Sequence, residues 1–132
     1  MEEKFSDKKI IFVTCGDWDL KTMLPNQCQL LNLSIPSYLK NWVNIKIAFA
    51  SFRGTKDRPR GMTDMLSLFN LPLIGRHHSG IDDSRNIAAV LMQLIKKGAK
   101  ISPTFLKKGV FFFFFFFSFS LLFNHYYFYY SI

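Results

Sequence analysis

The sequence predicts one α/β domain in residues 1–108, followed by an uncharged, aromatic tail in residues 109–132. The predicted elements follow the order strand, helix, strand, helix, helix, which is typical of α/β proteins. At 132 residues the chain has room for one domain and not for two. Every charged residue, and with them the net charge of +8, lies before the tail. These observations together define the predicted fold class and its boundary.

The first half of the chain predicts two strands with a helix between them. Ile10–Thr14 (IIFVT) is a β-branched and aromatic run that predicts a buried strand. Residues 19–33 have apolar positions near helical spacing. Pro25 interrupts this pattern, but a helix can restart there because proline is tolerated in a first turn. Residues 42–49 (WVNIKIAF) partly alternate and predict the second strand.

The second half predicts a basic loop and two helices. Residues 53–61 contain the loop, and residues 62–71 carry apolar side chains on one side of a short helix. After a second loop at 73–81, three residues with capping side chains, Asp82-Asp83-Ser84, predict the start of the clearest helix. Gly98 is expected to end it. Two strands are too few for a stable sheet, so part of the sheet is missing from this prediction. The helix is expected to bury Ile87, Val90, Leu91, Leu94 and Ile95.

The tail is unlike the rest of the chain. Residues 111–132 hold ten Phe and four Tyr and no charged residue, so their length and polarity permit a membrane-spanning helix. Each of these residues also has a codon without guanine, as expected when intron or untranslated DNA is translated. We therefore predict an artefact of exon assignment, with a membrane anchor and a packed structural segment as alternatives. If it is made, the tail is an aggregation hazard because it is uncharged and rich in β-formers.

The charge and the cysteines limit partners and compartment. A net positive charge favours binding to polyanions, because Lys and Arg that bind phosphates release condensed counterions. A solvated basic loop is an equally good explanation of the charge alone. Two cysteines give no disulfide framework, and residues 1–9 lack the apolar run of a secretory signal, so we expect an intracellular protein of the cytoplasm, the nucleus or both. The basic residues concentrated between positions 40 and 60, opposed only by Asp57, are Lys40, Lys46, Arg53, Lys56, Arg58 and Arg60.

Three clusters of acidic residues or histidines are candidates for chemistry. Each has a structural alternative: the first Asp pair can cap a helix, the second can be ordinary helix-start residues, and the histidines can be surface-loop residues. Zinc is a poor fit, because the cysteines and histidines lack the short paired spacings of structural zinc sites. The clusters are Asp17 with Asp19, His77 with His78, and Asp82 with Asp83.

Taken together, the clusters suggest hydrolysis of a phosphodiester. A carboxylate just after a buried strand and another at a helix start can converge on a divalent metal. A histidine on the loop five residues before the second carboxylate is placed to take a proton from water. Two metal ions roughly 4 Å apart, held by several carboxylates, are the usual means of such hydrolysis. The spacing alone is weak support.

The sequence around these residues resembles a known family. Residues 12–20 (FVTCGDWDL), with Leu24-Pro25 and Gln27-Cys28-Gln29 after them, resemble the second motif of DEDDh 3′→5′ exonucleases, in particular the enhanced-RNA-interference exoribonucleases. Residues 42–46 (WVNIK) resemble the strand that follows, and residues 75–88 (GRHHSGIDDSRNIA) resemble the third motif. The similarity extends over roughly residues 8–105. Residues 1–108 are therefore identified as the carboxy-terminal part of such an exonuclease domain.

The resemblance implies an activity and a role for each matching residue. It makes Asp19 and Asp83 metal ligands and His78 the general base, and these three residues form the catalytic set. It implies two Mg²⁺ ions, with Mn²⁺ as an alternative, single-stranded RNA 3′ ends as substrate, and nucleoside monophosphates as products. No small-molecule cofactor is expected, and no membrane partner unless the tail is an anchor. The resemblance and the charge suggest further contacts to nucleic acid from Arg76, Ser79, Asn86, Lys46 and Arg53.

The sequence departs from the family in two places. His77 stands where proline is common, which bears on loop stiffness more than on chemistry. Family members also carry an Asp-x-Glu pair on a first strand upstream, whereas Glu2-Glu3 has no strand around it. The resemblance thus implies an incomplete ribonuclease-H-like exonuclease fold, with the second half of the mixed sheet and its flanking helices. We expect the chain as written to bind Mg²⁺ weakly, to fold poorly alone and to be inactive. A non-catalytic RNA-binding or regulatory short isoform is the alternative.

Overall fold

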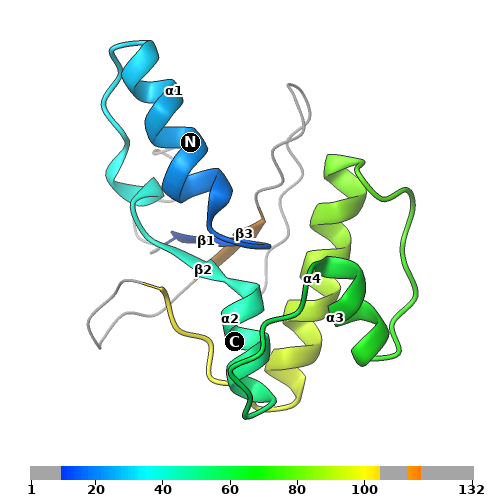
Figure 1. The fold of residues 1–132 in the computed structure, drawn as a ribbon. Coiled ribbons are helices and arrows are strands. Elements are labelled where there is room, and N and C mark those ends of the chain that lie inside the picture. The colour runs from blue at the N-terminus through cyan, green and yellow to red at the C-terminus, as the bar shows by residue number, and fades with distance from the viewer. Residues whose placement is uncertain (1–9, 105–112, 117–132) are drawn as a thin grey trace.

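The structure is a computed structural model that describes residues 10–104 and 113–116 of the chain. Figure 1 shows a small sheet with η1 and α1 on one side and α2, α3 and α4 on the other. The elements in chain order are β1 (Ile10–Thr14), η1 (Trp18–Met23), α1 (Leu24–Leu30), η2 (Ser37–Leu39), β2 (Trp42–Asn44), α2 (Ile45–Phe52), α3 (Met62–Leu68), α4 (Gly80–Lys96) and β3 (Phe113–Phe116). The predicted α/β fold is confirmed.

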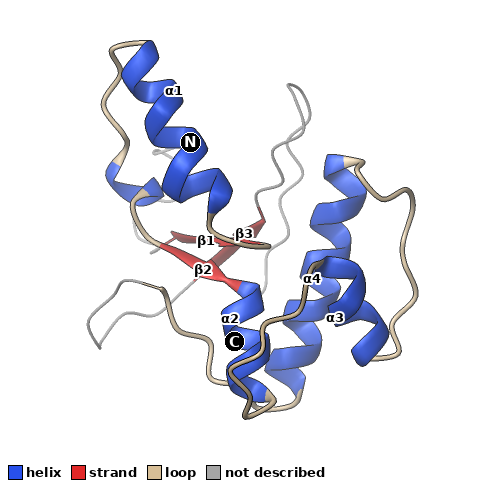
Figure 2. Cartoon of the chain, viewed as in Figure 1, coloured by secondary structure: helices blue, strands red, loops and turns tan. Residues whose placement is uncertain are grey.

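The sheet is parallel, and β1 is its central strand. Its order is β2-β1-β3, with Phe12 opposite Trp42 and Ile10 opposite Phe113. Alternate residues of β1 face opposite sides: Ile11 packs with α2, α3 and α4, whereas Phe12 packs with η1. A strand covered on both faces requires a nearly continuous apolar sequence, which explains the run IIFVT. Figure 2 shows this layered arrangement of helices around the strands.

The predicted strand over residues 42–49 is wrong beyond its third residue. The strand ends at Asn44, and α2 begins at Ile45. The Asn44 side chain accepts a hydrogen bond from the Lys46 backbone N–H at 3.0 Å, which satisfies one of the free donors of the first helical turn. The apolar residues that suggested a strand are instead the buried side of α2, which packs against α4.

The helical pattern over residues 19–33 is confirmed, but the helix does not stop at Pro25. Residues 18–23 form a π-helical turn, η1, and α1 follows directly with Pro25 in its first turn. Proline is accommodated there because its missing N–H would have no partner in a first turn.

The two predicted helices of the second half are both present. α3 ends at Leu68, three residues before the predicted end, and α4 begins at Gly80, two residues before Asp82. Gly98 has a φ of 76°, the left-handed conformation expected of a residue that ends a helix. The predicted buried side of α4 is confirmed. The core that α2, α3 and α4 form with the sheet contains Ile11, Val13, Val43, Ile45, Ala48, Phe49, Met62, Met65, Leu66, Ile87, Val90, Leu91 and Leu94.

Part of the predicted tail belongs to the sheet. Phe113–Phe116 forms β3, which pairs in parallel with the edge of β1 opposite β2. The strand that the sequence analysis lacked is therefore supplied from the tail. The rest of residues 109–132, apart from this strand, lies outside the described residues, and so do the predictions made for it. Across residues 10–104 and 113–116, no helix is both long enough and apolar enough to cross a membrane.

Candidate active site

The candidate site lies where β1 ends. In open parallel sheets, ligands bind beyond the carboxyl ends of the strands. Thr14, the last residue of β1, is fully buried, and its hydroxyl donates to the Gly16 carbonyl at 2.5 Å. Gly16 has a φ of 128°, a conformation that residues with a side chain rarely adopt. This turn delivers Asp17 and Asp19 to the carboxyl edge of the sheet.

The structure separates the roles of these two aspartates. The Trp42 indole N–H donates to Asp17 Oδ1 at 3.0 Å, so Asp17 ties the turn to β2. Asp17 also occupies the cap position of η1, but its side chain makes no capping hydrogen bond. Asp19 is partly buried, and this burial raises the pKa of its carboxyl above the ordinary value of 3.8. A raised pKa means that the charged form has lost hydration, which a nearby cation would offset. Asp19 is therefore the better candidate ligand.

A loop and the first turn of α4 supply the other predicted groups. The His78 backbone N–H donates to Asp83 Oδ1 at 3.3 Å, so the loop that carries the imidazole is held against this carboxylate. Asp82 is engaged differently. The Arg76 backbone N–H donates to it at 3.1 Å and lowers the pKa of its carboxyl, and Arg85 forms an ion pair with it at 3.3 Å. Asp82 therefore holds the loop, and Asp83 faces His78.

The loop before α4 has an unusual backbone. His78 has a φ of 67° and an exposed side chain, and its ring stacks on that of His77 with centroids 3.9 Å apart. Left-handed residues other than glycine are uncommon and concentrate at functional sites. Gly75 has a φ of 66°, and a Cβ there would overlap the Asp82 carboxylate. The loop can therefore lie close to α4 only with glycine at this position.

Asp19 and Asp83 come from different elements, but the charges of both carboxylates affect the pKa of one thiol, that of Cys15. Cys15 lies just after β1, and burial is the main reason that the pKa of its thiol is raised. The charges of Asp19 and Asp83 raise this pKa further, and the charge of Lys46 lowers it. Both carboxylates and one lysine thus lie within electrostatic reach of Cys15. Cys15 was not among the residues predicted for the site, although it lies between a buried strand and an acidic turn in the sequence.

The carboxylates are suited to Mg²⁺ but do not make a complete site. Carboxylate oxygens are the ligands that this hard cation prefers, and it requires about six oxygens in all. Within the described part of the chain, no group of three or more His, Cys, Asp or Glu side chains is placed to hold a metal ion. The strand beside β1, Phe113–Phe116, adds no carboxylate.

The remaining predicted contacts to nucleic acid differ in their surroundings. Asn86 is fully buried, and its amide is hydrogen bonded to Ile74 and to the Asp82 carbonyl, so in this structure it holds the loop to α4, and its contact with a phosphate stays a prediction. Arg76 is exposed in the loop, and Ser79 is half-buried at the cap of α4. The other two, Lys46 and Arg53, lie at opposite ends of α2.

Replacing Asn86 with alanine is expected to release the loop from α4. The Asn86 side chain accepts from the Ile74 N–H and donates to the Ile74 and Asp82 carbonyls, each at 2.8 Å. Loss of partners for such buried groups costs about 1–3 kcal/mol in the free energy of unfolding. Urea unfolding measures this cost. Ser84→Ala, which removes one hydrogen bond to the Gly80 carbonyl on the same helix, is the control. An equal effect of the two changes would contradict the assigned role of Asn86.

Asp19→Asn is expected to stabilise the metal-free chain at neutral pH. Because the pKa of Asp19 is raised in the folded chain, the folded state keeps this proton to higher pH than the unfolded state. The stability that this group contributes is therefore fully present below pH 3.8 and is lost as the pH rises through the raised pKa. Thermal unfolding in EDTA should show a higher melting temperature for the variant at neutral pH and no difference at low pH. Excess Mg²⁺ should reduce the difference in melting temperature between variant and parent at neutral pH, because only the parent keeps the Asp19 carboxylate that can bind the cation. A variant that melts below the parent at neutral pH in EDTA would refute this assignment.

The structure is thus a small parallel sheet covered by helices on both faces, with Asp19 in the turn that follows its central strand, an α/β arrangement whose ligands bind at the carboxyl ends of the strands. The family model described as Exonuclease matches residues 3–91, about two thirds of the chain. The chain therefore belongs to the exonuclease family. This confirms the predicted family.

Relatives and solved structures agree with this assignment. ERI1 exoribonuclease 3 of Homo sapiens is 50% identical over 90 residues, which cover 68% of this chain and 26% of that protein. The 3′-5′ exonuclease Snipper of Drosophila melanogaster is 36% identical over 93 residues, covering 70% of this chain and 32% of that protein. This chain thus spans about a quarter to a third of the length of these two relatives.

Two solved structures share the fold at substantial identity. The nuclease domain of 3′hExo, a DEDDh family member bound to rAMP, has a TM-score of 0.60 and 35% identity, covering 68% of this chain and 46% of that chain. The 3′-exonuclease solved in 3′-end-specific recognition of histone mRNA stem-loop has a TM-score of 0.62 and 34% identity, covering 67% and 40%. The predicted ribonuclease-H-like exonuclease fold is confirmed, as a part of these larger domains.

Proposed function

We propose that this chain supplies part of the site of a 3′→5′ exoribonuclease. In this proposal Asp19 and Asp83 hold divalent metal, Mg²⁺ by preference and Mn²⁺ as an alternative. His78 takes the proton of the attacking water. The observation that carries the proposal is that Asp19, in η1 just after β1, and Asp83, in the first turn of α4, both lie within electrostatic reach of Cys15, with the His78 backbone N–H bound to Asp83.

The candidate residues of this chain have different proposed roles. His78 is exposed, its backbone N–H binds Asp83, and imidazole is the side chain that exchanges protons most readily near neutral pH. Asp82 and Gly75 keep the loop close to α4, so that the imidazole remains at the site. When bound, a divalent metal supplies charge stabilisation for the phosphodiester and acidifies water.

The two candidate carboxylates, Asp19 and Asp83, are too few to bind Mg²⁺ tightly, so we propose that turnover needs further acidic residues. The place for them is beside β1, on the edge that β3 occupies, because a strand there ends near Asp19. In this structure that edge carries only phenylalanine. An Asp-x-Glu pair delivered to this edge would complete an oxygen-ligand set. The chain alone is then expected to bind Mg²⁺ weakly and to release little product.

The proposed substrate is a single-stranded RNA 3′ end, cut to nucleoside monophosphates. A similar nuclease domain was solved with rAMP, and another in recognition of a histone mRNA stem-loop. The positive charge of the chain is consistent with a polyanionic substrate.

The test compares this chain with a version extended at its amino terminus by the Asp-x-Glu segment of ERI1 exoribonuclease 3. RNA labelled at its 5′ end is incubated with each protein, with and without Mg²⁺. We expect the extended protein to shorten the RNA stepwise from its 3′ end only when Mg²⁺ is present, and the parent chain to be nearly inactive. Internal cleavage, trimming from the 5′ end, or trimming in EDTA would refute the proposal.

A second candidate function is RNA binding without catalysis by this chain as a short isoform. The pairing of β3 with β1 favours it, because the edge that would take a ligand-bearing strand is already filled. A mature transcript that begins at Met1 and an unextended chain that binds RNA without trimming it would support this candidate. Upstream exons that encode Asp-x-Glu in frame would support the enzyme.

A further inference from the structure

Seven of the seventeen Lys and Arg residues lie in two short segments, 53–60 and 96–100, which contain one acidic residue, Asp57. All seven side chains are exposed. Within residues 10–104, the only ion pair joins Arg85 to Asp82, so none of the seven is neutralised by a described carboxylate. We call this set the basic track. It consists of Arg53, Lys56, Arg58, Arg60, Lys96, Lys97 and Lys100.

The loop that carries the first four of these residues runs back along α2. It begins at Arg53, the residue that ends α2, and returns to the first turn of that helix. There the Lys46 ammonium donates to the Arg60 carbonyl at 2.7 Å, and the Arg60 N–H donates to Asp64 at 2.9 Å. Both ends of the loop are therefore fixed, and the basic side chains between them follow the length of α2.

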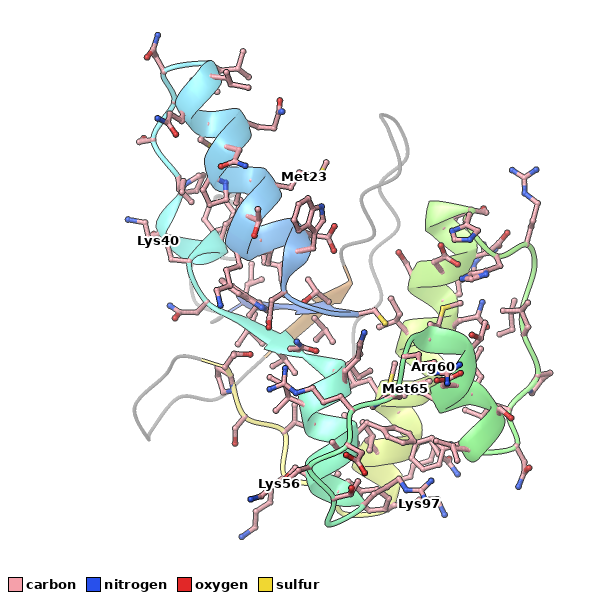
Figure 3. The ribbon with its side chains drawn as sticks, viewed as in Figure 1. Met23, Lys40, Lys56, Arg60, Met65 and Lys97 are labelled. Atoms are coloured by element: carbon pink, nitrogen blue, oxygen red, sulfur yellow. The ribbon has the colours of Figure 1, made fainter. Side chains whose placement is uncertain are left out.

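The track connects the candidate site to the far end of the domain. Lys46, whose ammonium binds the Arg60 carbonyl, lies in the first turn of α2, two residues after Asn44, which pairs with Thr14 at the carboxyl end of β1, so this end of the track is close to the site. Lys97 follows α4, whose 17 residues span about 25 Å from the turn that carries Asp83. Figure 3 shows Lys56 and Lys97 at the same end of the molecule, with Arg60 nearer α3.

We propose that the basic track binds the backbone of the RNA upstream of the 3′ end held at the site. This inference rests on the proposed function and adds to it a minimum length of RNA for tight binding. Exposed cations without carboxylate partners bind polyphosphates by releasing counterions. An anionic membrane fits less well, because the two segments hold no exposed large apolar side chain to insert between lipids.

Binding in EDTA tests the track without hydrolysis. Fluorescent oligouridines of roughly 4 and roughly 16 nucleotides, the range of common single-strand site sizes, are titrated with the full chain. The longer RNA is expected to bind about tenfold tighter or more at ~0.1 M salt. The double change Lys56→Glu with Lys97→Glu should abolish this advantage and should lower the slope of log affinity against log salt by about 1.4, or ~0.7 for each lost phosphate contact.

The matched control is Lys21→Glu with Lys40→Glu, which makes the same change of charge on exposed lysines of η1 and at the end of η2. Lys40 lies on the other side of the sheet from the track (Figure 3). The control should keep the advantage of the longer RNA. If both double variants weaken binding of the longer RNA equally, or if the Lys56→Glu, Lys97→Glu variant does not weaken it, the proposed role of the basic track is wrong. Circular dichroism checks that each variant is folded.

This experiment separates the track from the proposed function. If the extended protein trims RNA but shows no dependence of affinity on RNA length, the track is wrong and the function stands. If affinity depends on length and on Lys56 and Lys97, but the extended protein does not trim, the exoribonuclease proposal fails and the track stands as an RNA-binding surface.

Discussion

His78→Ala, made in the chain extended with an Asp-x-Glu segment, is expected to slow the release of nucleoside monophosphates by about 10²–10⁴-fold. The imidazole of His78 is the proposed proton acceptor, and its loop is held at Asp83 by the hydrogen bond of the His78 N–H. Single-turnover trimming of a 5′-labelled RNA measures the rate of the chemical step directly. Binding of the same RNA in EDTA should change little, because the proposed role is proton transfer.

The neighbouring histidine is the control for this change. The His77 ring stacks on that of His78 with centroids 3.9 Å apart, and His77 is likewise exposed, but no role in proton transfer is proposed for it. His77→Ala is expected to change the rate by less than about tenfold, through the loop alone. If the two alanine variants are slowed alike, His78 positions the loop and is not the base.

Phe49→Ala is expected to cost about 3–5 kcal/mol in the free energy of unfolding. The Phe49 side chain is 1% exposed at the centre of the packing between α2, α3 and α4, and its ring lies 4.8 Å from that of Phe69. Small domains have only about 5–15 kcal/mol in total, so this variant should lose a large fraction of the stability of the domain. Urea unfolding followed by far-ultraviolet circular dichroism measures the loss.

Phe52→Ala removes the same side chain one helical turn later and serves as the control. Phe52 is 37% exposed, and its ring meets the edge of Phe69 at 6.1 Å. Its loss is expected to cost about 1 kcal/mol, since little apolar surface returns to water. Equal destabilisation by the two changes would show that the α2–α3 contact, and not the deep core, limits the stability of this domain.

The helices and strands of this chain were predictable where one local pattern had one solution. Ile10–Thr14 has no polar residue before Thr14 at its end, so it predicted a buried strand. The long stripe of α4 and Gly98 after it likewise allowed one interpretation. Residues 42–49 allowed two, because a short apolar run suits a strand or a buried helix. Tertiary contacts decided it: Asn44 caps α2, and Phe49 packs into the core.

The candidate site was likewise predictable from the sequence only in part. Sequence motifs were sufficient to nominate Asp19, His78 and Asp83, because a resemblance transfers by position. They could not show what Asp17 does instead, since its hydrogen bond is to the indole of Trp42, twenty-five residues away along the chain. Nor could they show that Asn86 is buried, because its partner Ile74 belongs to an irregular loop.

By itself the sequence determined the α/β class, the family and the charge of the domain, and it nominated the candidate site residues, because each of these follows from local composition or from a short motif. Only the tertiary structure decided that Asp17 binds the Trp42 indole, where the basic loop lies, and which strand fills the second edge of β1. These depend on contacts between segments far apart in the chain, whose free energies arise only when the layers of the fold pack together.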